Sequence, residues 1–371
     1  MRIAFIDPVG WNYTLDAPYE RPMGGSESAL CYLAAELAKR DHAVTVLNGV
    51  RAAVESRGVH LDNISLAGSA AFLNAFDIVV LVGLAQGRVL RERVGVTAPL
   101  VLWTPHAHDQ PAVRDLSQQN ERQTWTGFAF VSEWQRQCYE KFFQLPHEKG
   151  RVLRNAVSPA FAAENGAAPW FATGEPPVLF YTSTPFRGLD VLLRAFPAIR
   201  SQIPEARLRV YSSMGVYQVG AADDKYRPLY DQCRAMDSVD YIGSIGQSRL
   251  AKELAGAAAL AYPSTFAETS CIAVLEAMAV GAAILTTRLG ALPETTAGLA
   301  SMVDWQGDKG RLAASFVATT VESLRDMREN PEAAAARRDQ RIKLIRDHYL
   351  WPARAREWEQ WLKQIASAPR S

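Results

Sequence analysis

The segment 262–281 carries the residues whose types and spacing suggest chemistry most directly. A short apolar strand ends near Pro263, a loop follows, and a helix is predicted to begin near Thr269 or Ser270 and to end at Ala279. The first N–H groups of a helix have no intrahelical partner and point outward with the positive end of the helix dipole. Phosphate groups bind at such helix ends. The backbone amides expected to face an anion are those of Thr269, Ser270, Cys271 and Ile272.

Two glutamates flank this predicted anion site. Glu268 comes just before the helix and Glu276 lies two turns along it. Eight residues of helical rise are about 12 Å, which matches the span of a diphosphate with a sugar at each end. A capped helix with two surface glutamates is the alternative. Glu276, however, sits inside the apolar run Cys271–Leu285, where an unpaired carboxylate is costly to bury. We therefore predict that both carboxylates bind hydroxyls of a nucleotide diphosphate sugar.

Two further positions favour phosphate recognition. Gly24 and Gly25 lack a Cβ, so their backbone can approach a ligand closely, although a plain loop pair is the alternative and no G-x-G-x-x-G fingerprint is present. Arg187 offers a planar fork of five donors to phosphate oxygens, or is a solvated surface arginine. We therefore predict that Gly24, Gly25 and Arg187 belong to the same ligand-binding site as Glu268 and Glu276.

The elements that must position these residues alternate between apolar strands and helices. Strands are predicted at 3–6, 43–47, 77–82, 100–103, 128–131, 178–181, 208–211, 241–242, 260–262 and 283–286. Helices are predicted at 26–40, 189–199, 226–236, 249–254 and 269–279, with a helical tail over 331–366 that breaks at Pro352. This alternation predicts parallel sheets covered on both faces, with ligands beyond the carboxyl ends of the strands.

The alternation restarts after a stretch rich in Pro, Gly and Ala at 159–177. We predict an α/β protein of two Rossmann-like, doubly wound domains facing across a cleft. The domains are expected at 1–165, which binds the acceptor, and 166–345, which binds the nucleotide sugar. The remainder, 346–371, is expected to be a helix that packs back across both, burying a stripe of Trp358, Leu362 and Ile365 beside Trp361.

Length and composition exclude several classes of protein. The chain has 371 residues, which is too long for one ordinary core, and 48% apolar residues, which excludes a disordered chain. Its 40 basic and 39 acidic side chains leave a charge of +1, so nothing favours nucleic acid as a partner. No signal peptide or membrane-spanning run is evident. Four scattered cysteines without a C-x-x-C pair predict free thiols in the cytoplasm and no metal site.

Motifs along nearly the whole chain resemble those of the retaining enzymes of glycosyltransferase family 4, also described as glycosyl transferases group 1. The strongest is the pair of glutamates separated by seven residues at a strand–loop–helix. The other matching stretches are Gly24–Leu30, Val131–Trp134, Val152–Val157 and Phe186–Asp190. The resemblance implies the GT-B fold and a retaining, metal-independent transfer of a hexose-type sugar, with a UDP sugar favoured over a GDP sugar. The leaving phosphate itself could take the acceptor's proton, so no protein base is named.

The resemblance also implies residue roles. Glu276 would hold the ribose, Glu268 the donor sugar and Arg187 the diphosphate. A histidine near the reacting carbon would be His106, with His108 left as an alternative. Asp109 would orient a histidine or the acceptor, or cap a turn.

Two departures from the family pattern affect the donor site. Relatives usually carry a second cation before the position of Arg187, where this chain has Thr182-Ser183-Thr184, so Ser183 or Thr184 would donate a hydrogen bond instead. Ser270-Cys271 replaces an aromatic residue and a glycine. Gly243, in the stretch 241–244, is expected beside the base.

Other functions remain open from the sequence. A non-hydrolysing epimerase of nucleotide sugars shares the fold and needs no acceptor, and a non-catalytic nucleotide-sugar-binding protein needs no turnover. The expected acceptor is a saccharide or a lipid-linked saccharide, and peripheral contact with the inner face of a membrane stays open. The sequence predicts no oligomeric state.

Overall fold

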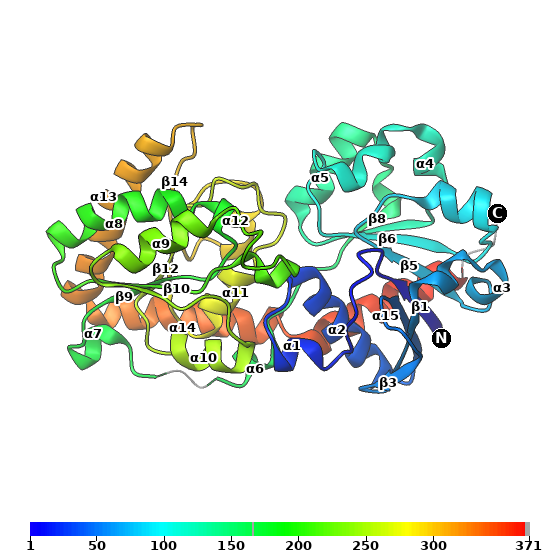
Figure 1. Cartoon of the computed structure of the whole chain (residues 1–371), viewed down its shortest axis with the longest axis horizontal. Coiled ribbons are helices and arrows are strands. Elements are labelled where there is room, and N and C mark those ends of the chain that lie inside the picture. The colour runs from blue at the N-terminus through cyan, green and yellow to red at the C-terminus, as the bar shows by residue number, and fades with distance from the viewer. Residues whose placement is uncertain (165–166, 368–371) are drawn as a thin grey trace. The chain divides into compact units, whose positions relative to one another are not determined.

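A computed structural model describes residues 1–164 and 167–367, which form two compact units (Figure 1). Unit 1 comprises Met1–Pro18, Gly25–Ala156 and the chain from Trp351 onward, and unit 2 comprises Tyr19–Gly24 and Val157–Leu350. The expected boundary between residues 165 and 166 falls outside the described residues. The tail that we expected to be one segment from residue 346 divides at residue 350 between the two units.

Unit 1 is built on an eight-stranded sheet in the order β3-β4-β2-β1-β5-β6-β7-β8. Every neighbouring pair is parallel except β3 and β4, which are antiparallel. The strands are β1 (Arg2–Ile6), β2 (Ala43–Asn48), β3 (Val54–Ser56), β4 (Val59–Asn63), β5 (Ile78–Val82), β6 (Leu100–Thr104), β7 (Gly127–Phe130) and β8 (Gly150–Val152). The predicted strands are confirmed. The sequence analysis missed β3, β4 and β8, which are short and carry polar or charged residues.

Helices cover the sheet of unit 1, and the tail helix is one of them. They are α1 (Ala17–Glu20, at the division between the units), α2 (Gly25–Ala38), η1 (Ile64–Gly68), α3 (Ala70–Leu73), η2 (Val89–Val94), η3 (Pro111–Ser117), α4 (Gln119–Gln123), α5 (Glu133–Phe143), η4 (His147–Lys149) and α15 (Trp351–Ser367). Helix α15 contacts α2. Trp358 is buried against the rings of Phe5 and Trp103, with centroids 6.4 and 5.0 Å away. The predicted apolar stripe of the tail is therefore confirmed as a packing face.

Unit 2 is built on a fully parallel six-stranded sheet in the order β11-β10-β9-β12-β13-β14. The strands are β9 (Val178–Tyr181), β10 (Arg207–Val210), β11 (Val239–Tyr241), β12 (Ala259–Tyr262), β13 (Ala283–Thr287) and β14 (Ser301–Val303). The chain builds outward from β9 to β11 and then returns to lay β12 on the other side of β9. The carboxyl ends of β9 and β12 therefore form a topological switch point, where ligands of such sheets bind.

Helices lie on both faces of this second sheet, with α8 and α13 on one face and α10 and α14 on the other (Figure 1). The helical segments are α6 (Pro159–Ala162), α7 (Trp170–Thr173), η5 (Pro185–Arg187), α8 (Leu189–Gln202), η6 (Met214–Tyr217), α9 (Arg227–Ala235), α10 (Gln247–Leu254), α11 (Ile272–Ala279), α12 (Leu292–Thr296), α13 (Lys309–Glu329) and α14 (Pro331–His348). The break predicted at Pro352 is confirmed, because α14 ends at His348 and α15 begins at Trp351. Helices α6 and α7 lie within the stretch we expected to be an irregular linker, and β14 and α13 were not predicted.

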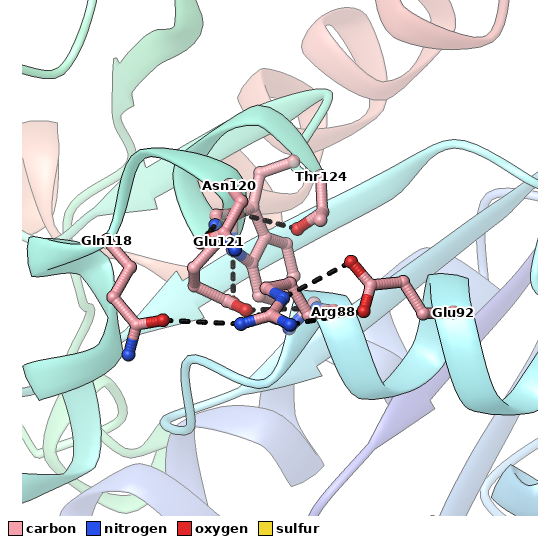
Figure 2. A network of polar contacts seen from close by, with 8 residues as sticks. Arg88, Glu92, Gln118, Asn120, Glu121 and Thr124 are labelled. Carbon is pink, nitrogen blue, oxygen red and sulfur yellow. Dashed lines mark hydrogen bonds and ion pairs between the residues drawn. The ribbon is translucent and has the colours of Figure 1, made fainter.

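A buried carboxylate holds the segment that follows β5 in unit 1 (Figure 2). Glu121 accepts hydrogen bonds from the backbone N–H groups of Gly87 and Arg88, at 2.6 and 3.0 Å, and from the indole N–H of Trp125, at 2.9 Å. The Arg88 guanidinium pairs with Glu92 at 3.2 Å. Glu121 is 2% exposed, and its three donors explain how an ionisable group is accommodated in the core.

Candidate functional site

The candidate donor site lies at the switch point of unit 2, where the predicted residues Arg187 and Glu268 follow adjacent strands. Arg187 ends η5 just after β9, and Glu268 follows β12. Gly188 makes this approach feasible, because its φ is +112° and a Cβ there would lie 2.1 Å from the carbonyl oxygen of Pro263. The predicted Arg–Gly step therefore has a steric reason in the fold.

Arg187 and Glu268 form an ion pair with each other. Arg187 Nη1 lies 2.8 Å from Glu268 Oε1 and 3.0 Å from Oε2. The Glu268 residue is 3% exposed, and the Arg187 guanidinium packs over the ring of Phe266, 4.7 Å from its centroid. Burial by itself would lower the pKa of Arg187, but the Glu268 carboxylate, together with smaller contributions from Tyr262, Tyr217 and Cys271, holds that pKa above its ordinary value. Arg187 is thus a fixed, charged part of the site.

Tyr262, the last residue of β12, is a site residue that the sequence analysis missed. Its hydroxyl donates to Glu268 Oε1 and lies 3.4 Å from Ser183 Oγ, while the residue itself is fully buried. Ser183 in turn accepts a hydrogen bond at its carbonyl oxygen from Ser212 Oγ, at 2.6 Å. A polar hydroxyl at the carboxyl end of an otherwise apolar strand was the signal that could have pointed to it.

Gly290 is a second residue that the sequence analysis missed. It follows β13, has a φ of +60°, and a Cβ there would lie 2.5 Å from the backbone oxygen of Glu268. The next residue, Ala291, donates its N–H to that same oxygen at 2.7 Å. The loop after β13 therefore fixes the main chain of Glu268, and only a glycine allows so close an approach.

Glu276 is a buried carboxylate with no partner among the described residues. It lies on α11 and is 6% exposed, and its side-chain carboxylate makes no hydrogen bond or ion pair with residues 1–164 or 167–367. Burial raises the pKa of Glu276 to about 8. A structural role does not explain a carboxyl group in this position, because a buried polar group without a partner is costly. The prediction that Glu276 is not an ordinary surface glutamate is confirmed.

The predicted start of the helix was wrong. Helix α11 begins at Ile272, with Cys271 at the N-cap and no side-chain capping hydrogen bond. Thr269, Ser270 and Cys271 belong to the preceding loop, so the 12 Å spacing that we derived from continuous helical rise between Glu268 and Glu276 does not apply. Burial raises the pKa of the Cys271 thiol, which lies within electrostatic reach of Glu268, Arg187 and Glu276. The two glutamates and the arginine thus surround one loop.

The loop after β9 contains hydroxyls without partners. The side-chain oxygens of Thr182 and Thr184 are buried and make no hydrogen bond to any described residue. Arg187 Nε is likewise buried and has no hydrogen-bond partner among the described residues. This is the stretch that lacks the family's second cation. Gly243 lies apart from them, after β11, with a φ of +76° and its N–H bonded to Val210 O at 3.3 Å.

His106 lies in unit 1, in the loop after β6. Its carbonyl oxygen accepts hydrogen bonds from Tyr139 Oη at 2.9 Å and from Gln135 Nε2 at 2.7 Å. Its Nδ1 lies 3.2 Å from Gln110 Oε1, and burial lowers the pKa of His106. A Cβ on Gly83, the residue after β5, would lie 3.4 Å from His106 Nε2. The neutral imidazole is thus held firmly at the carboxyl edge of this sheet.

His108 and Asp109 have different surroundings. The His108 ring stacks on Phe142, with centroids 4.0 Å apart and planes at 7°, and its buried Nδ1 has no partner among the described residues. Asp109 is exposed. The His108 ring is thus engaged by an aromatic residue on α5, whereas the choice of His106 over His108 stays a prediction.

Two buried carboxylates near the start of unit 1 were also missed. Asp7 follows β1, is 3% exposed, and accepts a hydrogen bond from Tyr13 Oη at 2.5 Å. Glu27 lies in the first turn of α2, is 8% exposed, and its Oε2 has no partner among the described residues. Burial raises the pKa of Glu27 to about 7, with a contribution from Asp7. Gly25 is the first residue of α2, and neither Gly24 nor Gly25 has a positive φ.

Two searches of the described residues found nothing. No group of three or more His, Cys, Asp or Glu side chains in that part of the chain could hold a metal ion. No helix there is long and apolar enough to cross a membrane.

Comparison with known proteins agrees with the resemblance stated from the sequence. Residues 175–323, which lie within unit 2, match the family model described as Glycosyl transferases group 1. The chain is 29% identical over 109 residues to D-inositol 3-phosphate glycosyltransferase from Corynebacterium glutamicum (strain R). That match spans 29% of this chain and 26% of the curated relative. The expected family resemblance is confirmed over this region.

Solved structures resemble the whole chain. Sucrose-phosphate synthase from Thermosynechococcus elongatus matches with a TM-score of 0.71 at 16% identity, covering 98% of each chain. The Anabaena protein HepE in complex with UDP-glucose matches with a TM-score of 0.66 at 13% identity, covering 98% of this chain and all of HepE. At these identities the likeness establishes the fold, and the predicted GT-B class, with two parallel-sheet domains, is confirmed.

Proposed function

We propose that this protein is a retaining glycosyltransferase that moves a hexose-type sugar from a nucleotide diphosphate sugar to a hydroxyl acceptor. The observation that carries the proposal is Glu276, a buried carboxylate without a partner, on the helix that follows the Arg187–Glu268 pair at the switch point of unit 2. A carboxylate in that position accepts hydrogen bonds from ligand hydroxyls at no cost to existing contacts. The match of residues 175–323 to Glycosyl transferases group 1 supports the same reading.

In the proposed complex, Glu276 accepts hydrogen bonds from the ribose and Glu268 from the donor sugar. Arg187 keeps guanidinium N–H groups that make no hydrogen bond with described residues, and these are available to the diphosphate. The amides of residues 269–272, and the free hydroxyls of Thr182 and Thr184, complete the set of donors. Preorganised donors of this kind stabilise the charge that develops on the leaving diphosphate.

The expected chemistry uses neither a metal nor a protein base. Arg187 supplies the positive charge that a divalent ion would otherwise provide, and the leaving phosphate takes the acceptor's proton on the same face of the sugar. Unit 1 is proposed to bind the acceptor, a saccharide or lipid-linked saccharide. A uridine nucleotide is favoured, since HepE, a protein of similar fold, binds UDP and UDP-glucose.

Thermal-shift screening against nucleoside diphosphates and their sugars tests the donor assignment, because a ligand that binds the native state raises its apparent stability. We expect UDP and UDP-sugars to raise the unfolding temperature of the wild type. Glu276→Ala should abolish most of that shift. Glu253→Ala is a matched control, because Glu253 is a glutamate of unit 2 that lies on α10, outside the candidate site. Equal shifts in all three proteins would contradict the assignment.

A second assay separates transfer from other uses of the same site. Labelled UDP-sugar is incubated with the protein alone, with a panel of saccharide and lipid-linked acceptors, and with the same panel plus EDTA. The proposal expects product only when an acceptor is present, unchanged by EDTA, and with the anomeric configuration of the donor. Conversion of the donor without an acceptor would instead identify an epimerase.

A further inference from the structure

The last residue of β12, Tyr262, carries a hydroxyl group to which the proposed function assigns no role. We propose that Tyr262 is a positioning residue, which holds one oxygen of Glu268 so that the other faces a hydroxyl of the donor sugar. The inference rests on the proposed function and adds to it which carboxylate oxygen of Glu268 accepts the hydrogen bond from the sugar.

The hydrogen bonds of Glu268 are distributed unequally between its two carboxylate oxygens. Oε1 accepts from both the Tyr262 hydroxyl and Arg187 Nη1, whereas the one donor to Oε2 among the described residues is Arg187 Nη1, at 3.0 Å. Each carboxylate oxygen has two lone-pair positions. Oε1 is therefore fully occupied within the protein, and Oε2 keeps one acceptor position for a ligand.

The main chain of Glu268 is fixed independently of its side chain. Its carbonyl oxygen accepts the N–H of Ala291 at 2.7 Å, and Gly290 packs against its backbone from the loop after β13. Removing the Tyr262 hydroxyl therefore leaves the backbone of Glu268 in place and allows only its side-chain carboxylate to rotate more freely. Arg187 alone then holds the group, through a single nitrogen that both oxygens share.

The environment of Tyr262 makes it a dependable donor. The ring is fully buried and packs against Tyr181, with centroids 5.7 Å apart. Burial and the adjacent Glu268 carboxylate both raise the pKa of Tyr262, so the phenol stays protonated and keeps donating across the physiological range. Ser183 Oγ lies 3.4 Å from the same hydroxyl. The arrangement predicts that a hydroxyl of the donor sugar binds at the open acceptor position of Glu268 Oε2.

Calorimetric titration of full-length wild type and variants with UDP and with UDP-glucose tests the inference. Tyr262→Phe removes one oxygen atom and retains the buried ring. We expect it to leave the Kd for UDP within twofold of the wild type and to raise the Kd for UDP-glucose about tenfold or more, which is the size expected for one hydrogen bond to a charged group. Glu268→Gln should raise the UDP-glucose value at least as much.

A matched control is Tyr211→Phe, since Tyr211 is a buried tyrosine of unit 2 whose hydroxyl donates to a different glutamate, Glu253, at 2.9 Å. This variant should leave both Kd values unchanged. The Tyr262→Phe/Glu268→Gln double variant should bind UDP-glucose within twofold of Glu268→Gln alone, because both changes act through one carboxylate.

The outcomes separate this inference from the proposed function. If Glu268→Gln weakens UDP-glucose binding and Tyr262→Phe does not, the positioning role is overturned and the proposed function stands. If Tyr262→Phe weakens UDP and UDP-glucose equally, its effect is merely structural and the inference is again overturned. A wild type that binds neither nucleotide overturns the proposed donor site, and the inference with it.

Discussion

Glu276→Gln should stabilise the unliganded protein while weakening its binding of the donor. Glu276 has a pKa of about 8 in the folded protein, against 4.5 for an ordinary glutamate, because burial disfavours its charged form. The folded state thus holds a proton that the unfolded state releases at lower pH. Stability contributed by this group is full below pH 4.5 and is lost as the pH rises toward 8.

The magnitude follows from the two pKa values. The stability lost relative to a permanently neutral side chain is about 1 kcal/mol at pH 5 and about 4 kcal/mol at pH 8. Glutamine has the shape of glutamate and cannot ionise, so Glu276→Gln should recover most of that difference. We expect wild type and variant to be nearly equally stable at pH 5, and the variant to be more stable by several kcal/mol at pH 8.

Urea denaturation at pH 5 and pH 8, followed by calorimetry with UDP, measures both effects. The matched control is Glu121→Gln in unit 1, because Glu121 is equally buried but accepts three N–H hydrogen bonds (Figure 2). That change should destabilise the protein at both pH values, since it presents an amide to donors. A Glu276→Gln variant that is less stable than the wild type at pH 8, or that binds UDP as tightly, would refute the reasoning.

Three more predictions follow from single contacts. Gly290→Ala should destabilise unit 2 by about 2–4 kcal/mol in urea denaturation, because its φ is positive and the added Cβ would clash with Glu268. Gly298→Ala is the control: this residue also has a positive φ but lies in open space, so the change should cost only about 1 kcal/mol. Equal costs for the two variants would count against the clash. Glu27→Gln should raise stability by about 3 kcal/mol at pH 8 and little at pH 5, since the pKa of Glu27 is about 7, and a gain independent of pH would contradict it. Arg187→Met should cost about 3 kcal/mol, because it leaves the buried Glu268 carboxylate without its counter-charge and with only the Tyr262 hydroxyl as a partner among the described residues. Adding Glu268→Gln should restore part of that stability, and an Arg187→Met variant as stable as the wild type would show that the pair is not coupled.

Local pattern was sufficient to predict the two sheets and the burial of Glu276. Parallel strands buried on both faces are short apolar runs. A carboxylate inside an apolar run, such as Glu276, is expected to be buried with its neighbours. The strands missed at Val54–Ser56, Gly150–Val152 and Ser301–Val303 are three residues long, which is too short to show a period. Their pairing with longer neighbours, and not their own composition, places them in the sheets.

The start of α11 shows where local pattern misleads. Thr269 and Ser270 are good capping residues, and the sequence favours a helix that begins with them. In the structure the helix begins at Ile272 instead. The loop after β13, which is distant along the chain, bonds to the backbone of Glu268 and holds the chain outside the helix. A propensity of adjacent residues cannot anticipate a contact of that kind.

The sequence by itself predicted which side chains of unit 2 form the candidate site, because residue type and spacing are local properties: an arginine before a helix, and two glutamates separated by seven residues. Tertiary structure alone decided how these groups are connected. Arg187 and Glu268 pair, Tyr262 occupies one carboxylate oxygen, and Gly290 supports the backbone, because three segments separated in sequence, those that follow β9, β12 and β13, meet where the order of the strands reverses. Hydrogen bonds depend on distances of a few ångströms, which only the folded chain defines.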